Sequence, residues 1–399
     1  MRAALYLFAV EIAPYQFFLR SKVIFQPGLA RDFSNELSQL GVAKLFLVCD
    51  PFFAKSGLAA AVKQGIESAG VEVVGLFSEV PPNSELKTVE ECARQAIEAE
   101  AEGLVVLGGG SAIDTAKAAN ILLSLGGDLV NDYSGSQTID RDLKPLIAIP
   151  TTAGTGSEVT SSAVIYDAAN RLKLSFNDSH LVPSLALLDP ELTLTVPPQV
   201  TAMTGMDAMT HAVEAITSVQ ANPMSEALAL KAIELLRQNL LDTVHDGGDL
   251  GRRGNLMAAA NMAGIAFEHA MVGVVHAMSH ATGGIAHVPH GMANSIYLPY
   301  GMEYNLEVAA AGYARMASAF GLNPSGDEEV DARAVIQAVR NLRQELNRAC
   351  GLPQRLSEAG VKEADLAEIA RNAVEDGTSF FNPREVTEEE VLAKIREAY

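Results

Sequence analysis

The first half of the chain alternates short apolar runs with stretches whose apolar residues have helical spacing. Four runs are candidate buried strands: 44–49 (KLFLVC), 71–77, 103–111 and 145–150. The stretches of helical spacing lie between them, at 56–70, 85–101 and 112–125. Strands and helices that alternate in this way predict a parallel sheet covered by helices on both faces.

The pattern changes after Pro197–Pro198. Strand-like runs disappear, and long stretches rich in Ala, Leu and Met follow, such as 223–244 and 252–271. Their apolar residues recur every three or four positions, which predicts a helical bundle that ends in a loop and one more helix. The chain of 399 residues is too long for one ordinary core. We therefore predict a doubly wound, Rossmann-like α/β domain over 1–197 and an all-helical domain over 198–399.

Composition narrows the class of protein. Hydrophobic residues make up 48% and charged residues 20%, as in globular proteins, and the net charge of -20 disfavours nucleic acid or an anionic membrane as a partner. The three cysteines are far apart and indicate no disulfide framework. The apolar run within 1–18 is ended early by Glu11, which favours an edge strand over a signal peptide. No stretch approaches a membrane span, so we expect a cytoplasmic protein.

Groups that can carry charge interrupt the apolar stretches of the second half. Five of the eight histidines lie between positions 269 and 290. Asp207 and His211 are four positions apart, and so are His276 and His280, which places each pair on one helix face. Gly283, Gly284 and Pro289 are expected to break the helix, so that His290 returns from a new element.

A bound divalent cation is the interpretation that we favour for these residues. A single histidine is more often a satisfied core or surface group, but several such groups in apolar helices are costly to bury without a shared partner. Imidazole and carboxylate suit Fe(II) and Zn(II). The predicted ligands are Asp207, His211, His276 and His290. Glu214 is equally consistent with a carboxylate that supports a ligand and with one on a helix surface.

Two loops predict a phosphate-containing cofactor. Gly108, Gly109 and Gly110 follow a strand and open a helix, where backbone N–H groups can approach a phosphate, and Ser111 is expected to cap that helix. The glycines alone are a weak signal, because tight turns need glycine anyway. A second loop, 150–160, follows the strand at 145–150 and is rich in hydroxyl groups that can wrap a pyrophosphate: Thr151, Thr152, Thr155, Ser157 and Thr160.

Both loops are expected at the carboxyl edge of the sheet, where open α/β sheets bind ligands. Asp50 ends the strand at 44–49 at the same edge. A carboxylate there can accept hydrogen bonds from a ribose and would repel a 2′-phosphate, which favours NAD over NADP. Lys173 could serve a phosphate or ribose, although a lone lysine is more often on the surface.

Taken together, these segments resemble the iron-containing (group III) alcohol dehydrogenases. The matching motifs are LGGGSAIDTAK, PTTAGTGSEVT, LLDPELTLTVPP, TGMDAMTHAVEA and GVVHAMSHATGGIAHVPHGMAN. The resemblance extends from about Lys22 to the C-terminus and is thin after about Tyr304. It implies the dehydroquinate synthase-like architecture of an α/β cofactor domain and an all-helical domain, with the site between them.

The resemblance also assigns roles to residues. It implies that the four predicted ligands hold Fe(II), or Zn(II) in some members, and that His280 lies beside the nicotinamide and substrate as the catalytic proton relay. Phe267 would line the substrate pocket. The residues implied to bind NAD are Asp50, Asn83, Gly109, Gly110, Ser111, Asp114, Thr151, Thr152, Thr155, Thr160, Ser162 and Lys173.

Four residues depart from the family pattern. Ser84-Glu85 follows Asn83 where the family often has Pro-Thr, and His269 and His287 stand where Asn is usual. Because both histidines flank the helix that carries His276 and His280, we expect a substrate range different from that of close relatives.

The implied function is hydride transfer between NAD(H) and a short-chain primary alcohol, aldehyde or diol, by a homodimer or larger homo-oligomer. The cation would act as a Lewis acid on the substrate oxygen. Four protein ligands and a substrate oxygen exceed tetrahedral coordination, which favours Fe(II). The alternatives are a glycerol-dehydrogenase-like or dehydroquinate-synthase-like enzyme of the same fold, a metal-dependent hydrolase, and a non-catalytic metal or nucleotide binder.

Overall fold

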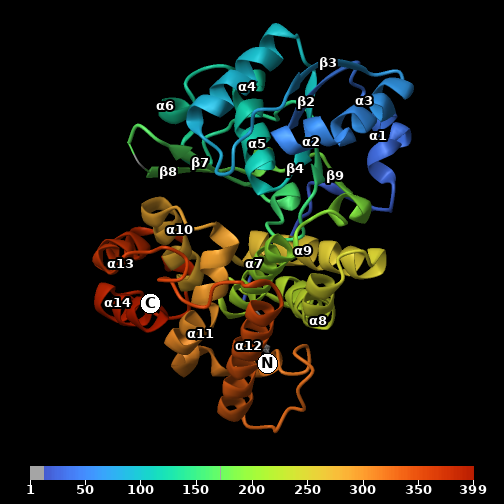
Figure 1. Ribbon diagram of the computed structural model, residues 1–399. Coiled ribbons are helices and arrows are strands. Elements are labelled where there is room, and N and C mark those ends of the chain that lie inside the picture. Colours follow the sequence, from blue (N-terminus) through green and yellow to red (C-terminus); the bar gives the residue numbers. More distant parts are fainter. Residues whose placement is uncertain (1–12, 171) are drawn as a thin grey trace, which may run out of the picture.

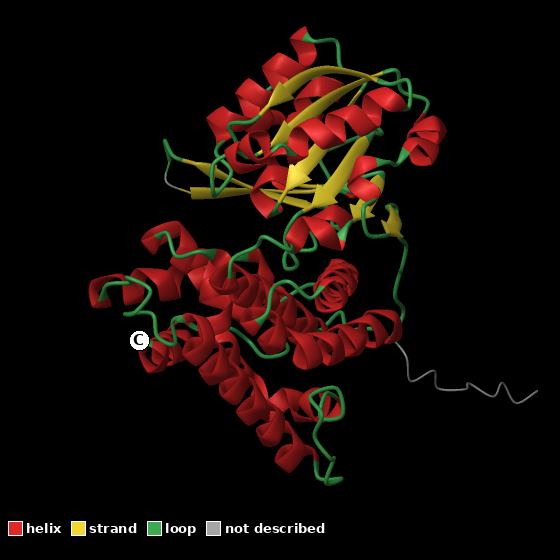
Figure 2. Ribbon diagram, turned by 45° about the vertical axis from the view of Figure 1, so that its right-hand side comes forward, coloured by secondary structure: helices red, strands yellow, loops and turns green. Residues whose placement is uncertain are grey.

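The computed structural model describes residues 13–170 and 172–399, and it divides into an α/β half and a helical half (Figure 1). The edge strand expected within 1–18 lies mostly outside the described residues, and residues 13–18 form no strand. Figure 2 shows the helical half packed against one edge of the sheet. The expected fold class is confirmed.

A six-stranded parallel sheet forms the core of the α/β half. Its strand order is β1-β9-β6-β4-β2-β3, and every neighbouring pair is parallel. The strands are β1 (Lys22–Phe25), β2 (Lys44–Cys49), β3 (Glu72–Phe77), β4 (Gly103–Gly108), β6 (Leu146–Pro150) and β9 (Leu185–Leu188). The four strands expected from the apolar runs are confirmed, and β1 and β9 are additional.

Helices cover both faces of this sheet because its strands alternate their side chains between two apolar clusters. Phe46 and Val106 pack with the helices on one face, and Leu47 and Val105 pack with those on the other. The helices of this half are α1 (Ser34–Leu40), α2 (Pro51–Ser56), α3 (Leu58–Ser68), α4 (Leu86–Glu98), α5 (Gly110–Leu125) and α6 (Leu129–Tyr133).

A second, three-stranded sheet has the order β5-β8-β7. β7 (Ser162–Asp167) and β8 (Leu172–Asn177) form an antiparallel hairpin, and β5 (Gly135–Ser136) pairs with β8. This hairpin was not predicted from the sequence, although residues 163–166 of β7 form a short apolar run; only alternate positions of β7 are buried. The hairpin extends toward α10 in Figure 1.

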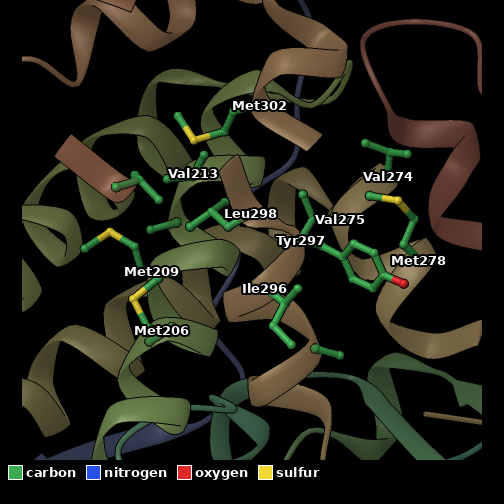
Figure 3. Close-up of a cluster of buried hydrophobic side chains, with 14 of the residues drawn as sticks. Met206, Met209, Val213, Val274, Val275, Met278, Ile296, Tyr297, Leu298 and Met302 are labelled. Atoms are coloured by element: carbon green, nitrogen blue, oxygen red, sulfur yellow. The ribbon is translucent and has the colours of Figure 1, made fainter. Parts of the chain in front are cut away.

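The second half is helical throughout its described residues, apart from loops and turns. Its helices are α7 (Pro198–Thr217), α8 (Pro223–His245), α9 (Leu250–Ala270), α10 (Val274–Ala286), α11 (His290–Arg315), α12 (Glu328–Cys350), α13 (Leu366–Glu375) and α14 (Glu388–Ala398). α7 contacts α8, α9 and α11 and is surrounded by them. One apolar core, with Met206, Met209, Val213 and Ile296 among its members, joins these helices (Figure 3).

The expected helix break before His290 is confirmed, but the two glycines do not cause it. α10 runs through Gly283 and Gly284 and ends at Ala286. His287 follows in the left-handed conformation, with φ of 56°, which His and Asn adopt more readily than most residues. Pro289 precedes the first turn of α11, so the proline contributes to the break and the glycines do not.

No single described helix is long and apolar enough to cross a membrane. α9 and α10 meet the length and composition criteria only as a pair, and they are bent by 104° relative to each other.

The two halves meet in a backbone contact between two glycines. Gly156 has a φ of +64°, and a Cβ on it would lie 2.5 Å from Cα of Gly264 on α9. A Cβ on Gly264 would in turn lie 2.8 Å from Cα of Gly156. The loop that follows β6 therefore lies directly on α9, with no side chain between them.

Gly264→Ala is expected to lower the free energy of unfolding by about 1–3 kcal/mol, because the added methyl group overlaps the backbone of the loop. Gly284→Ala is the matched control, since its Cβ would meet no atom within 4 Å and alanine is the better helix former. Urea unfolding of both variants measures the difference. Equal stability of the two variants would contradict the close contact.

Candidate metal and cofactor site

Four side chains from three helices converge in the helical half. Asp207 and His211 come from α7, His276 from α10 and His290 from the first turn of α11. One potential ligand atom from each lies within 4.8 Å of the others. Asp207, His211 and His276 are buried, and His290 is half-buried. The structure thus brings together all four of the predicted ligands.

Ring stacking holds the imidazoles beside one another. The centroids of His211 and His276 are 4.7 Å apart, and His211 also stacks on Phe267 at 4.3 Å. Phe267 on α9 is therefore adjacent to the ligand cluster. Because both faces of the His211 ring are covered, its orientation toward the cluster is restricted.

Glu214 supports His276. Its side chain is buried, so a helix-surface role is wrong. Oε1 accepts a hydrogen bond of 2.7 Å from the backbone N–H of Val275, and Oε2 lies 2.5 Å from Nδ1 of His276. Burial raises the pKa of Glu214 to about 7, although hydrogen bonds from Gly273, Val275 and His276 oppose the rise. A carboxylate on Nδ1 leaves the Nε2 lone pair free for a metal ion.

The donor set fits a divalent cation. Burial lowers the pKa of His211, and it lowers the pKa values of His276 and His290 well below the usual range, so the rings favour the neutral form that binds metals. Three neutral imidazoles and one carboxylate suit iron or zinc rather than Mg²⁺ or Ca²⁺.

His280 lies beside the cluster and is not part of it. Its ring stacks on His290 with a centroid distance of 5.1 Å, and its Nδ1 is 3.0 Å from Oδ2 of Asp376. Burial would raise the pKa of Asp376, but His280 and the donors of Thr378 lower it to about 2. The sequence did not point to Asp376, because it lies in the C-terminal tail, ninety-six positions from His280.

The glycine turn and the hydroxyl-rich loop meet at the carboxyl edge of the sheet. A Cβ on Gly109 would lie 3.2 Å from Oγ1 of Thr152, and one on Gly110 would lie 2.8 Å from Cγ2 of Thr155. Thr151 is buried and donates its backbone N–H to the carbonyl of Gly108. The absence of side chains on the turn is what lets the two loops approach.

Asp50 and Asn83 flank the same turn. Oδ1 of Asp50 accepts hydrogen bonds from the N–H groups of Phe52 and Phe53, so this carboxylate caps α2, and burial raises its pKa. The expected helix cap by Ser111 is wrong. Ser111 lies inside α5, whose N-cap is Gly109, and its Oγ accepts a hydrogen bond of 3.2 Å from the N–H of Asn83.

Three other predicted cofactor residues, Asp114, Thr160 and Ser162, take part in hydrogen bonds within the protein. Asp114 accepts hydrogen bonds from Ser157 Oγ at 2.6 Å and from the N–H of Val164 at 3.1 Å. Lys117 is buried, and its Nζ donates to the carbonyls of Thr160 and Ser162. These contacts fix the hydroxyl-rich loop to α5. Lys117 belongs to the motif LGGGSAIDTAK but was not among the predicted site residues. Burial lowers the pKa of Lys117 to about 8.

Lys173 on the hairpin reaches across to the helical half. Its Nζ would lie 3.4 Å from a Cβ on Gly283 of α10. Burial lowers its pKa, while the charges of Asp114 and Asp376 raise it. Tyr166 of the same hairpin packs edge-on against His287, with ring centroids 6.1 Å apart.

His269 faces the N-terminal segment. Its Nδ1 is 2.8 Å from the carbonyl of Ile265, its Nε2 is 2.7 Å from the carbonyl of Phe18, and its ring stacks on Phe17. These contacts explain a histidine at this position without reference to the substrate. The predicted effect on substrate range stays a prediction.

Comparison with known proteins agrees with this geometry. The sequence model described as "Iron-containing alcohol dehydrogenase" matches residues 20–190, and that described as "Fe-containing alcohol dehydrogenase family, C-terminal" matches 201–399. The chain belongs to the iron-containing alcohol dehydrogenase family. It is thus a member of a family of metal-dependent oxidoreductases, which supports this prediction over the hydrolase and the non-catalytic binder.

Two curated relatives of the iron-containing alcohol dehydrogenase family match almost the whole chain. The NAD-dependent methanol dehydrogenase of Bacillus methanolicus is 35% identical over 384 residues, which cover 96% of this chain and 99% of that protein. The 1,3-propanediol dehydrogenase of Klebsiella pneumoniae is 37% identical over 378 residues, covering 94% and 96%.

Solved structures of this type are also similar. A 1,3-propanediol oxidoreductase superposes with a TM-score of 0.93 at 35% identity, covering 97% of this chain and 100% of its own. A sulfoacetaldehyde reductase from Bifidobacterium kashiwanohense, solved with NAD+, has a TM-score of 0.84 at 28% identity and covers 97% of this chain and 99% of its own.

Glu214→Gln is expected to weaken Fe(II) or Zn(II) binding by about 10–100-fold, because an amide has one acceptor oxygen for the two donors that the carboxylate satisfies. The measurement is chelator competition with the stripped protein. Glu234→Gln is the control, since that side chain lies on the surface beside Lys231. Wild-type metal affinity in Glu214→Gln would remove the supporting role.

Proposed function

We propose that this chain catalyses hydride transfer between NAD(H) and a short-chain primary alcohol, aldehyde or diol at a centre that holds Fe(II). The ligands would be Asp207, His211, His276 and His290. The observation that carries the proposal is the approach of four buried or half-buried donor atoms, from three helices, to within 4.8 Å of one another. The same side chains lie against His280 and Phe267, which would provide a proton-exchanging group and an apolar wall beside the metal.

The identity of the metal follows from the number of donors. Four protein ligands and a substrate oxygen give five donors, whereas zinc sites are usually tetrahedral. Fe(II) is therefore favoured, and Zn(II) is the alternative. When bound, the cation supplies a Lewis acid toward the substrate oxygen.

The chain itself positions the reactants and a proton. His280 is held through Nδ1 by Asp376, so its Nε2 is the nitrogen available for proton exchange with the substrate oxygen. Phe267 supplies an apolar wall beside the ligands. Lys173 and the hydroxyl-rich loop approach the helical half from the other side, where the cofactor would bind.

NAD is the proposed cofactor. Asp50 ends β2 beside the glycine turn, and its carboxylate would repel a 2′-phosphate. A methanol dehydrogenase relative is named as NAD-dependent, and a sulfoacetaldehyde reductase neighbour was solved with NAD+. The residues proposed around the cofactor are Asp50, Asn83, Gly109, Gly110, Ser111, Asp114, Thr151, Thr152, Thr155, Thr160, Ser162 and Lys173.

The proposal extends to the location, the oligomeric state and the domain boundary of the protein. We infer a cytoplasmic enzyme that works as a homodimer or larger homo-oligomer, with a domain boundary at residues 197/198. The second candidate function is a glycerol-dehydrogenase-like polyol oxidoreductase.

Anaerobic assays of stripped protein reloaded with Fe(II) or Zn(II) test the proposed activity. Short aldehydes should oxidise NADH, and His276→Ala should lower kcat/KM by about 100–1000-fold, because several kcal/mol of charge stabilisation are lost. His245→Asn is the control, since His245 is exposed at the C-terminal end of α8. Turnover that does not depend on added metal would contradict the proposed centre, and turnover with glycerol alone would favour the polyol enzyme.

Asp50→Ser should raise kcat/KM with NADPH relative to NADH by at least about 10-fold, because it removes a charge that repels the 2′-phosphate. Glu72→Ser serves as the control, because Glu72 is an exposed carboxylate at the start of β3, away from the carboxyl edge. Steady-state kinetics with both cofactors give the ratio. An unchanged ratio would mean that Asp50 does not face the ribose.

A further inference from the structure

A buried amide lies among the candidate ligand atoms. Asn294 follows His290 by one helical turn on α11, so the two side chains share a face, and none of Asn294 is exposed. Its Nδ2 is 2.7 Å from Oδ1 of Asp207, 3.1 Å from Nε2 of His290 and 3.2 Å from Nε2 of His276. One nitrogen thus contacts candidate ligand atoms on three helices.

Two of the three atoms around this nitrogen are acceptors. His276 faces Glu214 through Nδ1, so its Nε2 presents a lone pair, and Asp207 presents a carboxylate oxygen. Acceptors that converge in a buried place repel one another unless a donor or a cation lies between them. The N–H₂ group of Asn294 is the uncharged group of this chain that meets the requirement.

The amide satisfies the surrounding ligand atoms only in part. It has two hydrogens for three neighbouring ligand atoms. Its other end, Oδ1, is buried and has no hydrogen-bond partner among the described residues. A buried acceptor without a partner costs free energy. The opposite orientation of the amide would cost more, because it would turn Oδ1, and therefore another lone pair, toward the ligands. The amide therefore holds the ligands together, but its incomplete hydrogen bonding favours its replacement by a cation.

We propose that Asn294 preorganises the metal centre by donating to the ligand lone pairs until a cation replaces it. When the cation binds, His276 and His290 direct their Nε2 lone pairs to it, and the amide keeps Asp207 as its partner. Asn294 is then a positioning residue and not a ligand. This inference rests on the metal centre proposed above.

Asn294→Asp tests the donor role because it keeps the size of the side chain and replaces N–H₂ by oxygen. In chelator-stripped protein we expect its melting temperature to fall by about 2–6 °C. Added Zn(II) should raise the melting temperature of the variant more than that of the wild type, because it relieves the extra repulsion. By linkage, the dissociation constant for Zn(II), measured by chelator competition, should fall by at least about 10-fold.

Asn294→Ala provides a second variant if the aspartate form does not fold without metal. Losing the donor destabilises the metal-free state more than the metal-bound state, in which only the bond to Asp207 is lost. Its Zn(II)-induced rise should therefore also exceed that of the wild type. A cavity alone would lower both states equally. Asn305→Asp is the matched control, because Asn305 is buried on the same helix and bonds to Asn382, away from the ligands. Its Zn(II)-induced rise should equal that of the wild type.

The outcomes separate the two proposals. A wild-type Zn(II)-induced rise in both Asn294 variants would overturn the preorganising role. Absence of any rise in the wild type with Zn(II) or Fe(II) would count against the metal centre itself. In that case, the metal-free melting temperature of Asn294→Asp, compared with that of Asn305→Asp, still decides whether the amide donates to the surrounding acceptors.

Discussion

Lone pairs that converge in an apolar surrounding need a common positive partner, and this constraint organises the helical half. Asp207, His211, His276 and His290 present acceptor atoms within 4.8 Å of one another, from helices that are otherwise rich in Ala, Met and Val. Glu214 fixes the ring of His276 from behind. The packing of α7, α10 and α11 thus serves to bring these atoms together.

The α/β half supplies the other side of the same site. Its carboxyl edge carries the glycine turn and the hydroxyl-rich loop, and the contact between Gly156 and Gly264 sets that loop directly on α9. Lys173 on the hairpin extends to α10. A cofactor bound at this edge would consequently face the ligand cluster, which is the arrangement that hydride transfer requires.

Apolar runs and helical spacing in the sequence made much of the fold and of the ligand cluster predictable. The central strands β2 and β4 have continuous apolar runs, and the spacing of Asp207 and His211 predicted a shared helix face. Features that depend on distant contacts were not predictable. The role of Asp376 depends on the tail folding against α10. The hairpin of β7 and β8 differs from the central parallel strands, because β7 is buried only at alternate positions. The cap was wrongly predicted at Ser111 because the helix begins two residues earlier than expected, at Gly110.

X-ray absorption spectroscopy of the stripped protein after anaerobic loading with Fe(II) tests the central claim most directly. The account predicts one iron per chain, with three imidazole nitrogens and at least one oxygen at about 2.0–2.2 Å. The imidazole scattering should decrease in His211→Ala. Iron bound without imidazole scattering, or a spectrum that this substitution leaves unchanged, would contradict the account.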